Sequence, residues 1–201
     1  MLKPMPADLA LTIRTAGTWD TARLIDAMTP ALEQTALAWW LQPAPARRAP
    51  SVRDHLRHLA GHTGGRVVFR VVERDGEILA GAAWTTCTDG AHPPGLLLPG
   101  DTAEPRRAAH LDARLAEVHP ADAHRHLLLL AVKPGRQRRG LGSALLADTG
   151  PDGPPMPSYT VLIPSLIAAA AHAGYHSTGL PVGITAAITL QPLRREPSPP
   201  Q

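Results

Sequence analysis

The chain has 201 residues, of which 44% are hydrophobic and 18% are charged, and its formal net charge is +3. This length suits one α/β domain with a sizeable core and is short for two. Aromatic residues make up 3% of the chain, which argues against a nucleic-acid surface that interleaves basic and aromatic side chains. No apolar run approaches the ~20 residues that cross a bilayer, and Met1–Ala10 lacks the pattern of a signal peptide.

The cysteine count indicates a reducing compartment. Cys87 is the single cysteine, so the chain forms no internal disulfide, as is usual in a reducing environment. We therefore expect a cytoplasmic protein that binds neither nucleic acid nor membrane, and the mild positive charge suits a small anionic ligand.

The N-terminal part predicts one strand followed by helices. β-forming residues predict a strand over 11–14, and Thr18 stands where an N-cap would precede a helix. Pro30 is expected to break that helix and restart the chain into a second one. The Pro-rich stretch over 43–50 predicts a loop, and a further helix is expected over 52–59.

A hairpin and another helix come next. The pair Asp75-Gly76 predicts a tight turn between strands over 66–73 and 78–86, because both residue types tolerate a left-handed backbone. After a Pro- and Gly-rich loop, apolar residues recur at helical spacing over 108–118.

The C-terminal part alternates strands and helices. A nearly continuous apolar run over 126–132 predicts a strand buried on both faces. A short helix from Leu141, a strand over 159–163, a helix over 165–173 and a strand over 184–190 follow it.

This order of elements predicts the fold class. The order β, helices, β-hairpin, helix, β, α, β, α, β favours an α/β (α+β) fold with a mixed central sheet flanked by helices. We expect a single domain over 1–201, with an ordered core of about 11–191 and flexible tails.

One segment, Leu127–Leu146, combines features that suit an anion. It reads LLLLAVKPGRQRRGLGSALL, a buried strand that runs through a basic turn directly into a helix. A helix start presents unpaired N–H groups and the positive end of the helix dipole. Gly140 and Gly142 lack a Cβ, so the backbone can approach an oxyanion closely. A P-loop pattern is absent, and a dinucleotide fingerprint would need glycine where Leu145 stands.

The turn Gln137–Gly142, which reads QRRGLG, matches the acetyl-CoA signature Q/R-x-x-G-x-G/A of the GNAT N-acetyltransferases. With this motif and its order of elements, the chain resembles that family over about 11–191. Within the family, the segment is most similar to the group that includes puromycin N-acetyltransferase. The resemblance implies the GNAT fold and acetyl-CoA or another acyl-CoA as co-substrate.

The resemblance also implies how the acyl-CoA is bound. Backbone N–H groups of the turn would hold the pyrophosphate, assisted by Arg138 or Arg139. The pantetheine arm would pair with the end of the preceding strand, where a bulge frees an N–H group to polarise the thioester carbonyl. The implied cofactor-binding residues are Leu130, Ala131, Val132, Gln137, Arg138, Arg139, Gly140, Leu141, Gly142 and Ser143.

The sequence departs from the family at the usual catalytic acid. Many members carry a tyrosine four residues before a Gly-Phe or Gly-Tyr pair, and that tyrosine protonates the departing thiolate. Here the pair is Gly174-Tyr175, and the position of the tyrosine is occupied by Ala170. Substitutes for the missing acid are Tyr159, Ser165, His172 and Tyr175.

Candidates for the general base flank or enter the central strand. They are Glu117, His119, His124 and His126, and imidazole has a suitable pKa. The alternative is that each histidine is a surface or capping residue and Glu117 a solvated side chain. His55, His58 and His62 share one helix face, but no carboxylate or cysteine completes a ligand set there. We therefore expect no metal.

These observations predict an N-acyltransferase. The acyl group would pass from acyl-CoA to the primary amine of a small molecule by direct attack. Two alternatives stay open: a non-catalytic acyl-CoA sensor, and an acyltransferase that takes its acyl group from a carrier protein. Whether the chain forms a homodimer also stays open.

Overall fold

The computed structural model describes residues 11–61, 67–88, 105–148 and 155–197. These residues form a mixed sheet with the strand order β1-β2-β3-β4-β5-β8-β6, and β7 pairs with β8. The strands are β1 Thr12–Thr15, β2 Val67–Arg74, β3 Glu77–Cys87, β4 His124–Val132, β5 Ser158–Leu162, β6 His176–Ser177, β7 Val182–Thr185 and β8 Ile188–Arg195. The α-helices are α1 Thr21–Leu32, α2 Ala36–Leu41, α3 Pro45–Gly61, α4 Pro105–Ala116, α5 Leu141–Ala147 and α6 Ile167–His172. The predicted mixed sheet flanked by helices is confirmed.

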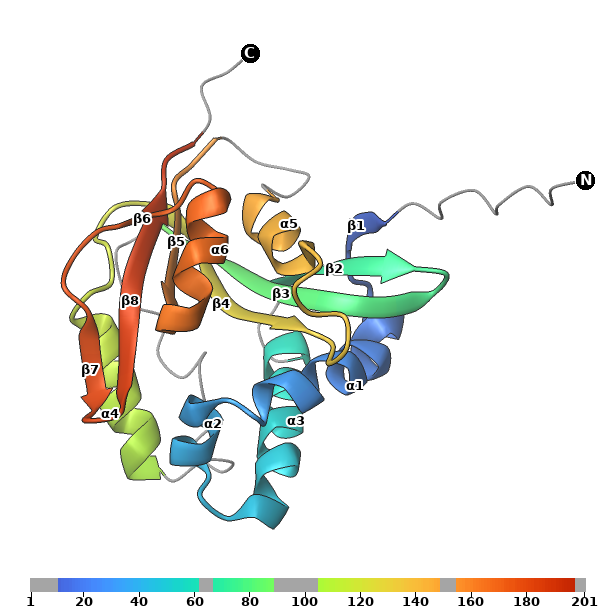
Figure 1. Cartoon of the computed structure of the whole chain (residues 1–201), viewed down its shortest axis with the longest axis horizontal. Coiled ribbons are helices and arrows are strands. Elements are labelled where there is room, and N and C mark those ends of the chain that lie inside the picture. The colour runs from blue at the N-terminus through green and yellow to red at the C-terminus, as the bar shows by residue number, and fades with distance from the viewer. Residues whose placement is uncertain (1–10, 62–66, 89–104, 149–154, 198–201) are drawn as a thin grey trace, which may run out of the picture.

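Helices lie on both faces of this sheet, as Figure 1 shows. Residues of α1 and α3 pack on one face, and those of α5 and α6 pack on the other. A third apolar cluster joins α2 and α4 to β7 and β8. No helix among the described residues is long and apolar enough to cross a membrane.

The hairpin of β2 and β3 forms as the sequence predicts. Asp75 and Gly76 have φ angles of 54° and 76°, which two-residue hairpin turns of the primed type require. The strands pair from Val67 with Thr85 to Arg74 with Glu77.

The prolines were predicted wrongly as helix breakers. Helix α1 runs through Pro30 to Leu32, and α3 begins at Pro45 and runs through Pro50. Pro45 occupies the first helical position, where the missing N–H has no partner to lose. The carbonyls that lose a bond to Pro30 and Pro50 belong to exposed residues four positions earlier, so water can replace the lost donor.

The C-terminal boundary of the core was also predicted too early. Strand β8 continues past residue 191 to Arg195, and its residues 191–195 pair with β5. Pro192 lies inside this strand, and a proline there reads as a strand end from sequence alone. Tyr159 pairs with Arg194 in the same ladder, so part of the predicted tail belongs to the sheet.

Candidate functional site

The sheet parts between β4 and β5, its one parallel strand pair among the described residues. These strands pair over Arg125–Leu127 and Ser158–Thr160, although β4 continues to Val132. Figure 1 shows β4 turning away from β5 towards α1. Backbone groups on this side of β4 beyond Leu127 therefore have no β5 partner and can pair with an extended ligand.

A bulge lies where the two strands begin to part. In the ladder of β3 and β4, Trp84 pairs with Leu127 and Ala83 with Leu129, so Leu128 is the extra residue. The sequence predicted the bulge at Leu130–Val132, and that position was wrong because those residues pair regularly with the segment 80–82 of β3. A bulge re-aims main-chain groups away from the regular pairing.

The turn between β4 and α5 has the backbone of an anion-binding loop. Gly135, Arg138 and Gly140 have φ angles of 78°, 59° and 80°, and Gly140 is the N-cap of α5. The side-chain Nε2 of Gln137 donates to the carbonyl of Val132 at 3.3 Å, which holds the turn against the end of β4. Alternating left- and right-handed residues direct successive N–H groups into one concavity.

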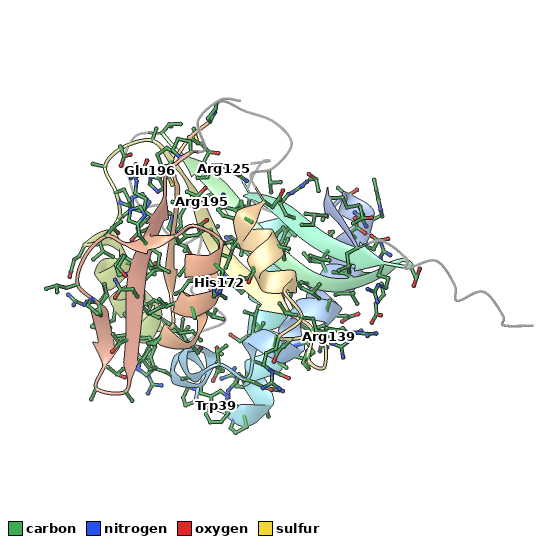
Figure 2. The ribbon with its side chains drawn as sticks, turned by 45° about the horizontal axis from the view of Figure 1, so that its top comes forward. Trp39, Arg125, Arg139, His172, Arg195 and Glu196 are labelled. Carbon is green, nitrogen blue, oxygen red and sulfur yellow. The ribbon has the colours of Figure 1, made fainter. Side chains whose placement is uncertain are left out.

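The basic residues of this turn divide into two groups. Lys133 donates to Glu77 at 2.5 Å, and Arg136 lies 3.5 Å from the same carboxylate. These contacts hold the pKa of Glu77 below its usual value, the Lys133 hydrogen bond being the larger cause. Arg138 and Arg139 are exposed and form no ion pair with a described residue. Figure 2 shows Arg139 beside the turn that leads into α5, so both remain available to an anionic ligand.

A cavity of about 200 Å³ lies against the parting strands. Its lining comes from β4, from the segment 161–163 and from helices α1 to α4, and it is largely apolar. The polar side chains among the described lining residues are Thr35, Gln42, Arg48, Ser51, His55 and His126. Arg48 is the one arginine among these described residues, and no carboxylate is among them.

His55 is a site residue that the sequence analysis treated as one of a solvated row. Its side chain is 6% exposed and lines the cavity from α3. Both ring nitrogens are buried without a hydrogen-bond partner among the described residues. Burial, with a smaller effect of His58, lowers the pKa of His55 from 6.5 to about 3. His55 is therefore neutral near pH 7 and is suited to hydrogen bonding more than to strong general-base catalysis.

The structure brings the predicted histidines together. The ring centroids of His119 and His124 are 4.7 Å apart, and those of His119 and His126 are 5.3 Å apart. All three rings contact the ring of Tyr159. Of these histidines, His126 also lines the cavity. The sequence left open whether the side chain of His126 faces solvent or the interior. In the structure that side chain is buried.

Glu117 and Tyr175 lie outside the cavity lining. Glu117 is exposed and forms an ion pair with Arg114, one turn earlier. Tyr175 is 4% exposed and packs with Ala170 in the cluster under α5 and α6. Burial raises the pKa of Tyr175, and the Arg195 guanidinium, 5.2 Å from the ring centroid, opposes that rise. The ten predicted cofactor-binding residues lie together, on the part of β4 that has no β5 partner, on the turn and at the start of α5.

Comparison with known proteins identifies the architecture. No protein-family model matches the chain, and no curated protein matches it. The solved structure of histone acetyltransferase HPA2 and related acetyltransferase from Corynebacterium glutamicum superposes with a TM-score of 0.67 at 18% identity, covering 95% of this chain and 98% of that one.

Two further acetyltransferase structures are similar. The ribosomal-protein-S18-alanine N-acetyltransferase of Escherichia coli matches with a TM-score of 0.51 at 15% identity, over 96% of this chain and 97% of that one. An agmatine N-acetyltransferase matches with a TM-score of 0.56 at 13% identity, over 92% and 99%. Acetyltransferases of the GNAT family from Desulfovibrio desulfuricans and Bacillus cereus also have similar structures. The chain therefore has the fold of the GNAT acetyltransferases.

Proposed function

We propose that the protein is an acyl-CoA-dependent N-acyltransferase whose acceptor is a small primary amine. One observation carries the proposal: β4 separates from β5 at the bulge of Leu128. This separation lies between the turn Gln137–Gly142 and an apolar cavity. A donor with a pyrophosphate at one end and a thioester at the other can reach from that turn into the cavity.

The donor side is supported by three features of the chain. The turn offers backbone N–H groups, left-handed residues and the exposed arginines Arg138 and Arg139 to a pyrophosphate. Leu130–Val132 offer backbone groups to the amides of a pantetheine arm. The bulge at Leu128 would leave an N–H group to polarise the thioester carbonyl. Acetyl-CoA is the donor we propose, since a cavity of about 200 Å³ leaves little room for a long acyl chain.

The cavity also suggests the chemistry of the acceptor. Structures of this fold include an agmatine N-acetyltransferase, a ribosomal-protein-S18-alanine N-acetyltransferase and a histone acetyltransferase. A cavity with no carboxylate in its described lining, and with Arg48 in it, disfavours an acceptor that carries a second cationic group. We therefore propose an acceptor with one primary amine on an apolar body.

Proton transfer uses the groups that reach this cavity. The amine attacks the thioester carbonyl, the carbon–sulfur bond breaks, and the amine proton must leave. His126 and His55 are the imidazoles that line the cavity, and His126 is the sequence-predicted base that the proposal retains. Ala170 supplies no acid to the thiolate, which is a tolerable leaving group without one.

The test is acyl transfer by the purified protein. Acetyl-CoA would be incubated with a panel of hydrophobic monoamines, agmatine and an alanine-ended peptide, and free CoA thiol would be followed against amine-free controls. We expect amine-dependent thiol release, fastest with the monoamines. CoA binding without release for any amine would favour the acyl-CoA sensor, the alternative that Ala170 supports. Absence of both binding and release would contradict the proposal.

A further inference from the structure

A cluster of one cysteine and three histidines lies beside the cavity, and the strand register builds most of it. Cys87 on β3 pairs directly with His124 on β4. His126, two residues further along β4, lies on the same face as His124 because side chains alternate along a strand. His119 joins them from the segment between α4 and β4. We call Cys87, His119, His124 and His126 the Cys-His cluster.

The members of the Cys-His cluster are close enough for one metal ion. One potential ligand atom of each residue lies within 4.8 Å of those of the other three. In a tetrahedral zinc site, Zn–N and Zn–S bonds of about 2.0–2.3 Å place ligand atoms about 3.3–3.6 Å apart. A contraction of about an ångström by side-chain rotation would therefore complete the site.

The cluster is buried, and His124 is held in the tautomer that a metal needs. Cys87, His124 and His126 are 4%, 0% and 4% exposed. The Nδ1 of His124 lies 2.7 Å from the carbonyl oxygen of Asp122, and a carbonyl can only accept, so Nδ1 carries the proton. Nε2 then presents a lone pair, and it is buried without a hydrogen-bond partner among the described residues. A backbone carbonyl on the other ring nitrogen is the usual support of a metal-bound histidine.

We propose that the Cys-His cluster binds Zn²⁺. One thiolate and three neutral imidazoles are a ligand set that zinc prefers, whereas Mg²⁺ and Ca²⁺ require oxygen ligands. On binding, the thiol of Cys87 loses its proton to solvent, and each imidazole donates a lone pair without losing a proton. Four protein ligands leave no open position, which is typical of a structural zinc site.

The position of the site indicates its role. Zinc there joins β3 and β4 to His119, which follows α4, and so fixes the segment 117–123 against the sheet next to the cavity. The inference does not rest on the acyltransferase activity. It does bear on the base, because a zinc-bound His126 cannot accept the amine proton, which would then pass to water. The sequence analysis expected no metal anywhere in the chain, because it weighed His55, His58 and His62, the last of which lies outside the described residues, and did not combine Cys87 with β4.

Metal analysis of the purified protein tests this inference. After purification without chelators and removal of any affinity tag, elemental analysis should find about one zinc per chain. Cys87→Ser and His124→Ala should lower the zinc affinity by roughly 100-fold or more, since even changes to groups that only support a ligand cost about 10–100-fold. His172→Ala is the matched control, because His172 lies exposed on α6 (Figure 2), and it should retain zinc.

A second readout does not depend on a variant that must fold. Wild-type protein stripped with a chelator and loaded with Co²⁺ should show a thiolate-to-cobalt charge-transfer band. Since Cys87 is the single cysteine, that band would assign the thiolate ligand without ambiguity. The inference would be overturned if folded wild-type protein holds no zinc, shows no charge-transfer band with Co²⁺ and gains no thermal stability with Zn²⁺.

Discussion

Asp20, the N-cap residue of α1, forms ion pairs with two arginines, Arg14 and Arg23. Its carboxylate is 0% exposed and accepts from Arg14 at 2.6 and 2.9 Å, from the Gly17 N–H at 2.9 Å, and from Arg23. Arg14 also pairs with Glu73 of β2. These bonds tie β1, the start of α1 and the hairpin together, and they hold the pKa of Asp20 well below its ordinary value of 3.8, the Arg14 hydrogen bond being the largest cause.

We predict that Asp20→Asn lowers the free energy of unfolding by about 2 kcal/mol near neutral pH, the scale of hydrogen bonds to a charged group. A carboxyl whose pKa is depressed by folding contributes stability that is complete above its unfolded pKa and is lost as pH falls below it. Urea unfolding should therefore show a wild-type-to-variant difference that shrinks from about pH 4 downward. Half-exposed Asp54, paired with Arg57, is the control, and Asp54→Asn should change stability little. A difference that stays constant down to about pH 2.5 would refute this role of Asp20.

Tyr175 provides a second prediction at the residue scale. It lies in the cluster under α5 and α6 and not in the cavity lining, so it is poorly placed to protonate the leaving thiolate. Tyr175→Phe should lower turnover less than about tenfold and leave CoA affinity unchanged, because a working general acid contributes about 10²–10⁴-fold. A rate loss above roughly a hundredfold with intact CoA affinity would show that Tyr175 is the acid.

Among the elements, α1 and β3 make a contact that depends on a glycine. A Cβ built on Gly81 would lie 2.8 Å from Sδ of Met28 and 3.2 Å from Cδ1 of Leu24. The absence of a side chain thus lets α1 lie close to the centre of the sheet, near the strand that forms the site.

We predict that Gly81→Val lowers the free energy of unfolding by about 1–3 kcal/mol through overpacking. Met28→Ala should lower it too, by opening a cavity. The double variant should lose less than the sum of the two, because the new methyls fill the space that Met28 vacates. Additive losses in denaturant unfolding would mean that the two residues do not share this space.

Elements with a local chemical cause were predictable from sequence. The Asp75-Gly76 turn depends on two backbone φ values, and the strand-turn-helix of the motif is contained within the segment Leu127–Leu146. The continuation of α1 through Pro30 was not predictable, because burial of its apolar face on the sheet outweighs the local break. The bulge at Leu128 depends on the register with β3, which no local pattern reveals.

At the scale of the whole molecule, the site lies where the sheet parts between β4 and β5. The turn comes from one short segment, whereas the cavity combines β4 with α1 to α4 and with 161–163. Sequence therefore predicted ten donor-binding residues within one continuous segment, and it could not show that His55 of α3 meets His126 of β4 at one cavity. The sequence analysis missed the Cys-His cluster for the same reason, because Cys87 and His124 are brought together by strand pairing.

The most direct test of the account is calorimetric titration of CoA into wild type, Gly140→Val and Gly76→Val. Gly140 and Gly76 have φ angles of 80° and 76°, and a Cβ at either meets nothing within 4 Å. Both variants should therefore lose similar stability, about 1–2 kcal/mol from backbone strain, but Gly76 belongs to the hairpin turn and not to the motif. We predict that Gly140→Val weakens CoA binding at least about tenfold while Gly76→Val binds as wild type does. Folded Gly140→Val protein with wild-type CoA affinity would contradict the account.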